Sequence, residues 1–167
     1  MRRALALLAL AACSDDGGTP DAYPTAKCLI QGDYGDLGTK SGTTTQGPTT
    51  ATIVLDPGPP RDSFFLKLTA GQGAFAGGLA NGTYSIAGAD ATFTGCGLCV
   101  NIIADIVTGG GPSKFYFADS GSVTLTATQP PAGSITNVHL VEINIGTGAP
   151  VPDACEATIS SLLFSAS

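Results

Sequence analysis

The alternation of apolar and polar side chains is the pattern that most restricts how this chain can fold. Residues 122–128 read Ser-Val-Thr-Leu-Thr-Ala-Thr, so every second side chain is apolar. A period of two places Val123 and Leu125 on one face and the threonines on the other, which predicts a half-buried β-strand. The same period recurs in 63–69 and 100–107, whereas no long segment after the N-terminal region repeats with the period of a helix. The chain is therefore predicted to be all-β.

Glycine and proline divide the predicted strands. The chain holds 23 Gly and 11 Pro, and these residues cluster in segments such as 56–60 and 146–153. Proline has no N–H to donate to a sheet, so the clusters predict loops. Short strands separated by such loops are typical of an antiparallel β-sandwich, Ig-like or jelly-roll-like, which we place over residues 27–167.

Three segments depart from this regular pattern. Residues 31–49 carry five glycines and are predicted to form a long loop with one short strand. Residues 114–128 are predicted to form a hairpin that turns at Asp119-Ser120-Gly121. In residues 135–145 the apolar positions change parity, which predicts a β-bulge near 139–141.

The N-terminus has the composition of an export signal. Two basic residues, Arg2-Arg3, precede an apolar run over Ala4–Leu10, and small residues lead to Cys13. Acidic and glycine residues then follow abruptly. This order is that of a secretory signal peptide, and the apolar run is far shorter than the roughly 20 residues that a membrane-spanning helix needs.

The end of this signal, Leu10-Ala11-Ala12-Cys13, resembles the lipobox of bacterial prolipoproteins. The resemblance implies that residues 1–12 are removed as a signal peptide and that Cys13 carries acyl chains that insert into a lipid bilayer. Several acyl chains together give stable anchoring. Because Ser14 is not the Asp that enteric bacteria use for retention at the inner membrane, the resemblance favours the outer membrane. Residues 13–26, acidic and rich in Gly and Pro, are predicted to be a flexible tether.

A second resemblance covers part of the domain. The segment Lys114–Thr126, the triplet Val-Glu-Ile at 141–143 and the last strand with its cysteine are similar to uncharacterised lipoproteins of myxobacteria. This resemblance implies no activity.

The charge of the chain excludes one class of partner. Asp and Glu number 13 against seven Lys and Arg, which gives a net charge of −6, and cleavage of the signal would remove two of the basic residues. An acidic surface repels the phosphates of nucleic acids. We therefore expect no nucleic acid partner, and a protein or a glycan stays open.

Four cysteines remain beyond the lipidated one, namely Cys28, Cys96, Cys99 and Cys155. An even set in an exported domain predicts two disulfides. One arrangement joins Cys96 to Cys99 through a turn and Cys28 to Cys155, and the others join Cys28 to Cys96 or to Cys99. A thioredoxin-type redox role would need a helix after the first cysteine, and a β-strand is predicted there instead. Zinc would need further ligands that the sequence scarcely offers.

Catalytic and metal-binding patterns are weak. His139 is the single histidine, and a Ser-His-Asp triad would need it beside a serine and an aspartate in one cleft. Asp33-Tyr34-Gly35-Asp36 could offer oxygen ligands to calcium, but it lacks the spacing of an EF-hand loop, so a solvated turn is expected. We therefore predict that the protein is not an enzyme and holds no cofactor or metal.

Aromatic residues supply the last candidate site. Phe65 and Tyr116 fall on the parity opposite the more regular apolar stripes, so their exposure would create a patch for a sugar or protein ligand. The alternative places both on a second buried face. The function predicted from the sequence is a membrane-anchored, non-catalytic binding or structural domain. A carbohydrate- or calcium-binding module is the alternative, followed by a hydrolase that uses His139.

Overall fold

The computed structural model describes residues 33–56, 61–106, 109–110, 112 and 114–167. These ranges contain eight strands and two short 3-10 helices, and no helix within them is long and apolar enough to cross a bilayer. The all-β prediction is therefore confirmed. The predicted signal peptide, the tether, Cys13 and Cys28 lie outside the described residues. The elements are β1 (Asp33–Gly42), β2 (Thr50–Asp56), β3 (Arg61–Leu68), η1 (Gly73–Phe75), β4 (Gly82–Ser85), η2 (Gly88–Ala91), β5 (Leu98–Ile106), β6 (Lys114–Thr128), β7 (Pro131–Glu142) and β8 (Glu156–Ala166).

All strands belong to one sheet, in the order β1-β8-β7-β6-β5-β3-β2, with β4 paired to β6 beyond the end of β5. Every neighbouring pair is antiparallel except β1 and β8, which run parallel. The sheet is thus mixed, whereas the sequence predicted strictly antiparallel pairing. A parallel pair needs a long connection, and here residues 43–155 separate the first strand from the last.

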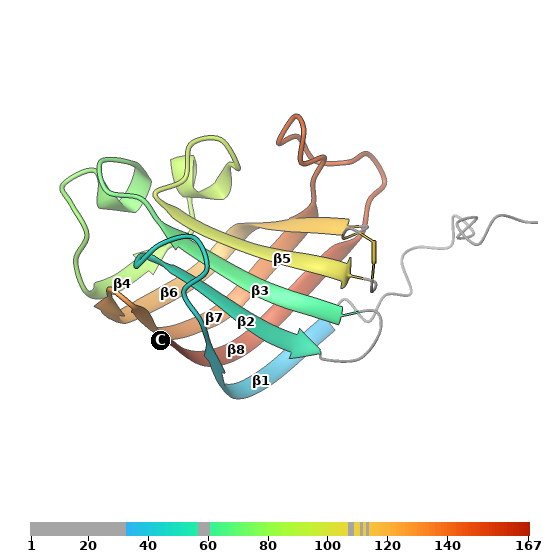
Figure 1. The fold of residues 1–167 in the computed structure, drawn as a ribbon. Helices are drawn as coiled ribbons and strands as arrows, with labels where there is room; N and C mark the ends of the chain where they lie inside the picture. The colour runs from blue at the N-terminus through green and yellow to red at the C-terminus, as the bar shows by residue number, and fades with distance from the viewer. Residues whose placement is uncertain (1–32, 57–60, 107–108, 111, 113) are drawn as a thin grey trace, which may run out of the picture.

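The sheet also curls on itself instead of splitting into the two layers of a sandwich (Figure 1). Its edge strands meet where Thr43 and Thr52 form a β-bridge, with N–H···O distances of 3.0 and 2.9 Å. A Cβ atom on Gly42 would lie 2.3 Å from the Thr52 carbonyl oxygen, so the approach requires glycine. A single curled sheet can enclose a core in the way that two packed sheets do. Because its edge strands approach each other, few strand edges stay unpaired.

The predicted hairpin at 119–121 is a β-bulge within one long strand, β6. Ala118 pairs with Leu140 and Ser120 with His139, so Asp119 is the extra residue. A Cβ atom on Gly121 would lie 2.7 Å from the Val138 Cα, which shows that glycine serves a close approach to β7 and not a turn.

The strand pairing of β7 and β1 differs from two further predictions. The bulge expected near 139–141 of β7 lies earlier, at Asn137, where φ is 49° and the pairing with β6 shifts. Residues 33–42 form a full edge strand and not a loop. The pairing of β1 with β8 shifts register on both sides of Gly35, so this glycine marks irregular strand pairing and not a loop.

The core fills the inside of the curl. In β2, β3 and β5 to β8, inward-facing side chains are almost fully buried, as the period of two predicts, whereas β1 and β4 contribute the half-buried Tyr34, Leu37 and Tyr84. A second apolar cluster lies on the outer face of β5 and β6. This explains the change of parity in 135–145, since Leu140 belongs to the core and Ile143 to the outer cluster. The buried residues of the outer cluster are Cys96, Cys99, Phe117 and Ile143, with Phe93, Phe115 and Val141 packed against them.

A buried carboxylate joins the loops that carry η1 and η2 to the start of β5. Asp90, 4% exposed, accepts hydrogen bonds from the Gly97 and Leu98 N–H groups to Oδ1 at 2.7 and 2.8 Å. Its Oδ2 accepts the Ala74 N–H at 2.7 Å. One side chain therefore ties η1 and η2 to the first residues of β5.

Replacing this carboxylate should destabilise the fold. Asp90→Ala leaves three N–H groups without their acceptor, and we expect the free energy of unfolding to fall by about 2–4 kcal/mol in urea denaturation followed by circular dichroism. Glu156→Ala removes an exposed carboxylate and serves as the control, with an expected change within about 0.5 kcal/mol. Equal effects of the two substitutions would contradict the role assigned to Asp90.

Candidate functional site

The outer face of the sheet carries a pocket of about 340 Å³. Its floor is β5, whose side chains Asn101 and Ile103 point away from the core that holds Val100 and Ile102. The neighbouring strands continue the floor, with Phe65 of β3 paired to Asn101 and Phe115 of β6 paired to Ile103. The pocket therefore follows from the alternation of the strands, because the residues between the core positions face it.

Connecting loops form the rim of the pocket. Phe93 comes from the segment after η2, Ile143 and Ile145 follow β7, and Gln46 lies between β1 and β2. The loops after η2 and β7 rise along the same side of the sheet (Figure 1). The ring of Phe93 packs edge-on against Phe117, with centroids 5.8 Å apart and an angle of 86° between the planes. The rim is thus attached to the outer apolar cluster.

A disulfide closes one end of the pocket. Cys96 and Cys99 are bonded, with Cα atoms 5.2 Å apart, across a turn whose Gly97 N–H binds Asp90. The predicted Cys96–Cys99 pair is confirmed. Because the pair precedes a β-strand and not a helix, its surroundings differ from those of a thioredoxin-type site. Cys155 is also disulfide-bonded, and its expected pairing with Cys28 stays a prediction because Cys28 lies outside the described residues.

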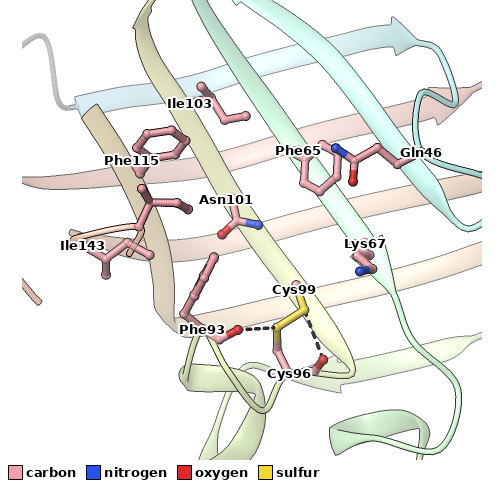
Figure 2. Close-up of a pocket in the computed structure, with 11 residues that line it drawn as sticks. Gln46, Phe65, Lys67, Phe93, Cys96, Cys99, Asn101, Ile103, Phe115 and Ile143 are labelled. Carbon is pink, nitrogen blue, oxygen red and sulfur yellow. Dashed lines mark hydrogen bonds between the residues drawn. A yellow bond between two sulfur atoms is a disulfide. The ribbon is translucent and has the colours of Figure 1, made fainter. Parts of the chain in front are cut away.

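Polar side chains are few in the pocket. Figure 2 shows Asn101 in the middle of the floor, Lys67 beside Cys99, and Gln46 against Phe65. The side chains of these three polar residues form no hydrogen bond or ion pair within the described part of the chain. The rest of the lining is apolar apart from the disulfide.

The two aromatic residues singled out by the sequence are separated by the sheet. Phe65 lies on the outer face and lines the pocket, whereas Tyr116 is 1% exposed and belongs to the core. The candidate patch of Phe65 with Tyr116 does not form, because Tyr116 pairs with the core residue Ile102 and points inward, and the alternative in which both are buried holds for Tyr116 alone. Phe65 instead shares the pocket with Phe93 and Phe115, which the analysis of the sequence missed.

The hydroxyl of Tyr116 is unusual within the core. It is buried and has no hydrogen-bond partner among the described residues. Burial and the nearby charge of Glu142 raise the pKa of Tyr116 well above its usual range, so the phenol stays neutral. The Tyr34 hydroxyl near the same end of the sheet donates to Asp62 Oδ2 at 2.7 Å.

His139 contacts two carboxylates on the outer face of β7. Its Nδ1 lies 2.8 Å from Asp119 Oδ1, and its Nε2 lies 3.5 Å from Glu156 Oε2. In a Ser-His-Asp triad the second nitrogen faces a serine, and here it faces Glu156. Ser160 and His139 both line a hollow of about 170 Å³, but their side chains share no hydrogen bond in the described structure. The triad geometry is therefore not assembled among these residues.

Asp36, one of the acidic residues considered for calcium, binds groups of the protein itself. Asp36 Oδ1 accepts hydrogen bonds from the Gly38 N–H at 2.9 Å and from the Ser161 hydroxyl, and these bonds lower the pKa of Asp36. Within the described residues no group of three or more His, Cys, Asp or Glu is arranged to hold a metal ion.

Comparisons with protein families, curated proteins and solved structures found no match for this chain. Two hollows of the described structure, the pocket over β5 and the smaller one beside His139, are therefore the candidates for a binding site. The pocket over β5 is the larger, and it combines an apolar lining with unpartnered polar groups.

The two carboxylates beside His139 should raise the pKa of this side chain. The hydrogen bond to Asp119 is the main cause that raises the pKa of His139 above its usual value of 6.5. The protonated His139 therefore stabilises the folded state fully below pH 6.5, and this stabilisation is lost as pH rises through the folded-state pKa. NMR titration of this single histidine should give a pKa above 6.5, and Asp119→Asn should lower it. A pKa that Asp119→Asn leaves unchanged would contradict the assignment.

Proposed function

We propose that this protein is an exported, lipid-anchored binding protein whose β-domain holds a small apolar ligand in the pocket over β5. The observation that carries the proposal is the pocket itself. Its volume of about 340 Å³ lies at the lower end of the range for ligand sites, roughly 300–1,000 Å³. Its chemistry, mostly apolar with a few polar side chains, is that of such sites.

The position of the pocket favours a binding role over a packing defect. The core of the domain is enclosed on the other face of the sheet. On the outer face, Ile145 is 48% exposed at the rim, beside aromatic side chains that are only half buried. An apolar concavity that stays open to water is typical of a surface that receives a ligand.

The proposed anchoring rests on the lipobox resemblance at Cys13. Acyl chains there would hold the domain at a membrane through the segment of residues 13–26. In this arrangement the pocket would meet ligands in the periplasm or at the cell surface, with the outer membrane favoured.

A carbohydrate ligand is the second candidate. Aromatic rings beside amide side chains are a combination suited to sugars, and Phe65 with Asn101 and Gln46 offers it. The pocket is lined mainly by Phe and Ile, which lack the polar groups that many sugar hydroxyls would require. An apolar ligand is therefore the better fit.

The binding proposal is tested by filling the pocket. We expect the neutral fluorescent probe N-phenyl-1-naphthylamine to bind the full chain carrying Cys13→Ser, purified without detergent. Ile103→Trp places a larger side chain on the pocket floor and should weaken this binding by about tenfold or more, since it displaces the probe.

The matched control is Leu163→Trp, which changes an exposed apolar residue of β8 outside the pocket. It should leave the affinity for the probe within about twofold. Equal loss in both variants, or no binding to the parent chain, would refute the proposed pocket.

The anchoring proposal is tested by mass. Intact protein extracted from its native membrane should begin at Cys13 and carry the extra mass of acyl chains, and Cys13→Ser should remove both that mass and the membrane association. A chain that keeps Met1 and carries no lipid would refute the anchor.

A further inference from the structure

We infer that the ligand of the pocket over β5 is a small amphiphile with a negatively charged head, such as a short-chain carboxylate with an aliphatic or aromatic body. Lys67 and Asn101 would bind the head, and the phenylalanine side chains would bind the body. The inference rests on the proposed binding function and specifies its ligand.

Lys67 is the first reason for a negative head. It lies on the outer face of β3, lines the pocket, and forms no ion pair with a described residue. Lys114 offers a contrast, because its Nζ lies 3.6 Å from Asp105. In a chain with 13 acidic residues and seven basic ones, an unpaired lysine beside an apolar pocket is a local exception to the negative surface. It therefore complements an anion.

Asn101 is the second reason. Its side chain is half buried in the middle of the floor and has no hydrogen-bond partner among the described residues. Partial burial of a polar side chain costs free energy unless water or a ligand forms hydrogen bonds with it. Its amide N–H groups can donate to a carboxylate oxygen.

The register brings these two donors together. Phe65 pairs with Asn101, and Lys67 pairs with Cys99, so Lys67 and Asn101 are diagonal neighbours on adjacent strands. Side chains at such positions are about 7–8 Å apart at their bases, within reach of one shared group for a long side chain. One carboxylate between them could accept hydrogen bonds from both.

The apolar part of the pocket lies to one side of these donors. Figure 2 shows Lys67 near the disulfide and Asn101 in the middle of the floor, whereas Ile103 and Phe115 lie at the end away from the disulfide. Ile143 lies near Phe115, whereas Phe93 lies beside the disulfide, with its carbonyl oxygen 3.6 Å from Cys96 Sγ. A ligand with its head toward Cys99 and its body toward Phe115 would match both halves of the pocket.

The same features argue against other ligands. A phosphate ester with two negative charges would find a single lysine on the pocket wall. A cationic amphiphile would be repelled by that lysine. A neutral amphiphile would form no charge-assisted hydrogen bond with the ammonium, so it should bind more weakly than the anion.

The test compares ligands that share one apolar body. Isothermal titration calorimetry with the full chain carrying Cys13→Ser would measure octanoate, 1-octanol and octyltrimethylammonium. We expect octanoate to bind about tenfold more tightly than 1-octanol, and the cation to bind least, because a charge-assisted hydrogen bond is formed only with octanoate.

Two substitutions locate the effect. Lys67→Met keeps the apolar stem and should weaken octanoate binding by about tenfold while changing 1-octanol by less than about twofold. Lys40→Met removes a positive charge from β1, outside the pocket lining, and should leave octanoate affinity unchanged. Asn101→Asp adds a negative charge to the floor and should abolish octanoate binding while strengthening that of octyltrimethylammonium.

The outcomes separate the inference from the proposed function. Equal affinities for octanoate and 1-octanol, or an unchanged octanoate affinity in Lys67→Met, would overturn the charged-head assignment while the neutral probe still reports a pocket. Failure of the neutral probe and of all three ligands would overturn the binding function itself.

Discussion

The structure depends on the burial of both faces of β5 and β6. A curled sheet covers its inner face with its own side chains, but the outer face of the same strands also carries Phe115 and Phe117. Apolar side chains on an outer face must be covered by something other than the sheet. Loops supply this cover, and the second apolar cluster forms where they pack on the strands. The pocket is the part of this outer face that the loops leave open.

Loops can cover a sheet only if they are held in place, because their backbone has no ladder of hydrogen bonds. Asp90 and the Cys96–Cys99 disulfide provide the attachment. The carboxylate binds the Gly97 N–H within the turn that the disulfide closes, so polar and covalent constraints act on the same few residues. The side-chain oxygens of Asp90 accept hydrogen bonds from three N–H groups, so this buried polar group and its three donors are all satisfied. This fixes the end of the pocket against which the head of a ligand would lie.

Local patterns predicted the strands and the close cysteine pair but not the curvature. The alternation in 122–128 and 63–69 identified β6 and β3 because each residue there has one clear side. The pattern gave the wrong prediction at 119–121. Asp-Ser-Gly has the composition of a turn, but Gly121 instead permits the close approach of β6 to β7. The pattern misled again for Tyr116, because parity alone cannot tell which face lies inward until the bulge at Asp119 is known. The outer cluster had a signal in the change of parity at Val141 and Ile143, which marks burial on both faces.

The candidate site could not be predicted because its residues come from segments far apart in the chain. Gln46, Lys67, Asn101 and Ile143 meet only when β3 pairs with β5, and β5 with β6. Lys67 in the sequence is one polar position on an alternating strand, indistinguishable from a solvated lysine. The structure gives it a different neighbourhood, since its strand partner Cys99 is buried and the next outward residue, Phe65, lines an apolar hollow. A cation between a disulfide and aromatic rings is exposed to water on one side and to apolar surface on the other. An amphiphilic anion would place its negative head against the lysine and its apolar body against the rings. The charge of Lys67 and the apolar lining together therefore favour a ligand class that neither feature would favour alone.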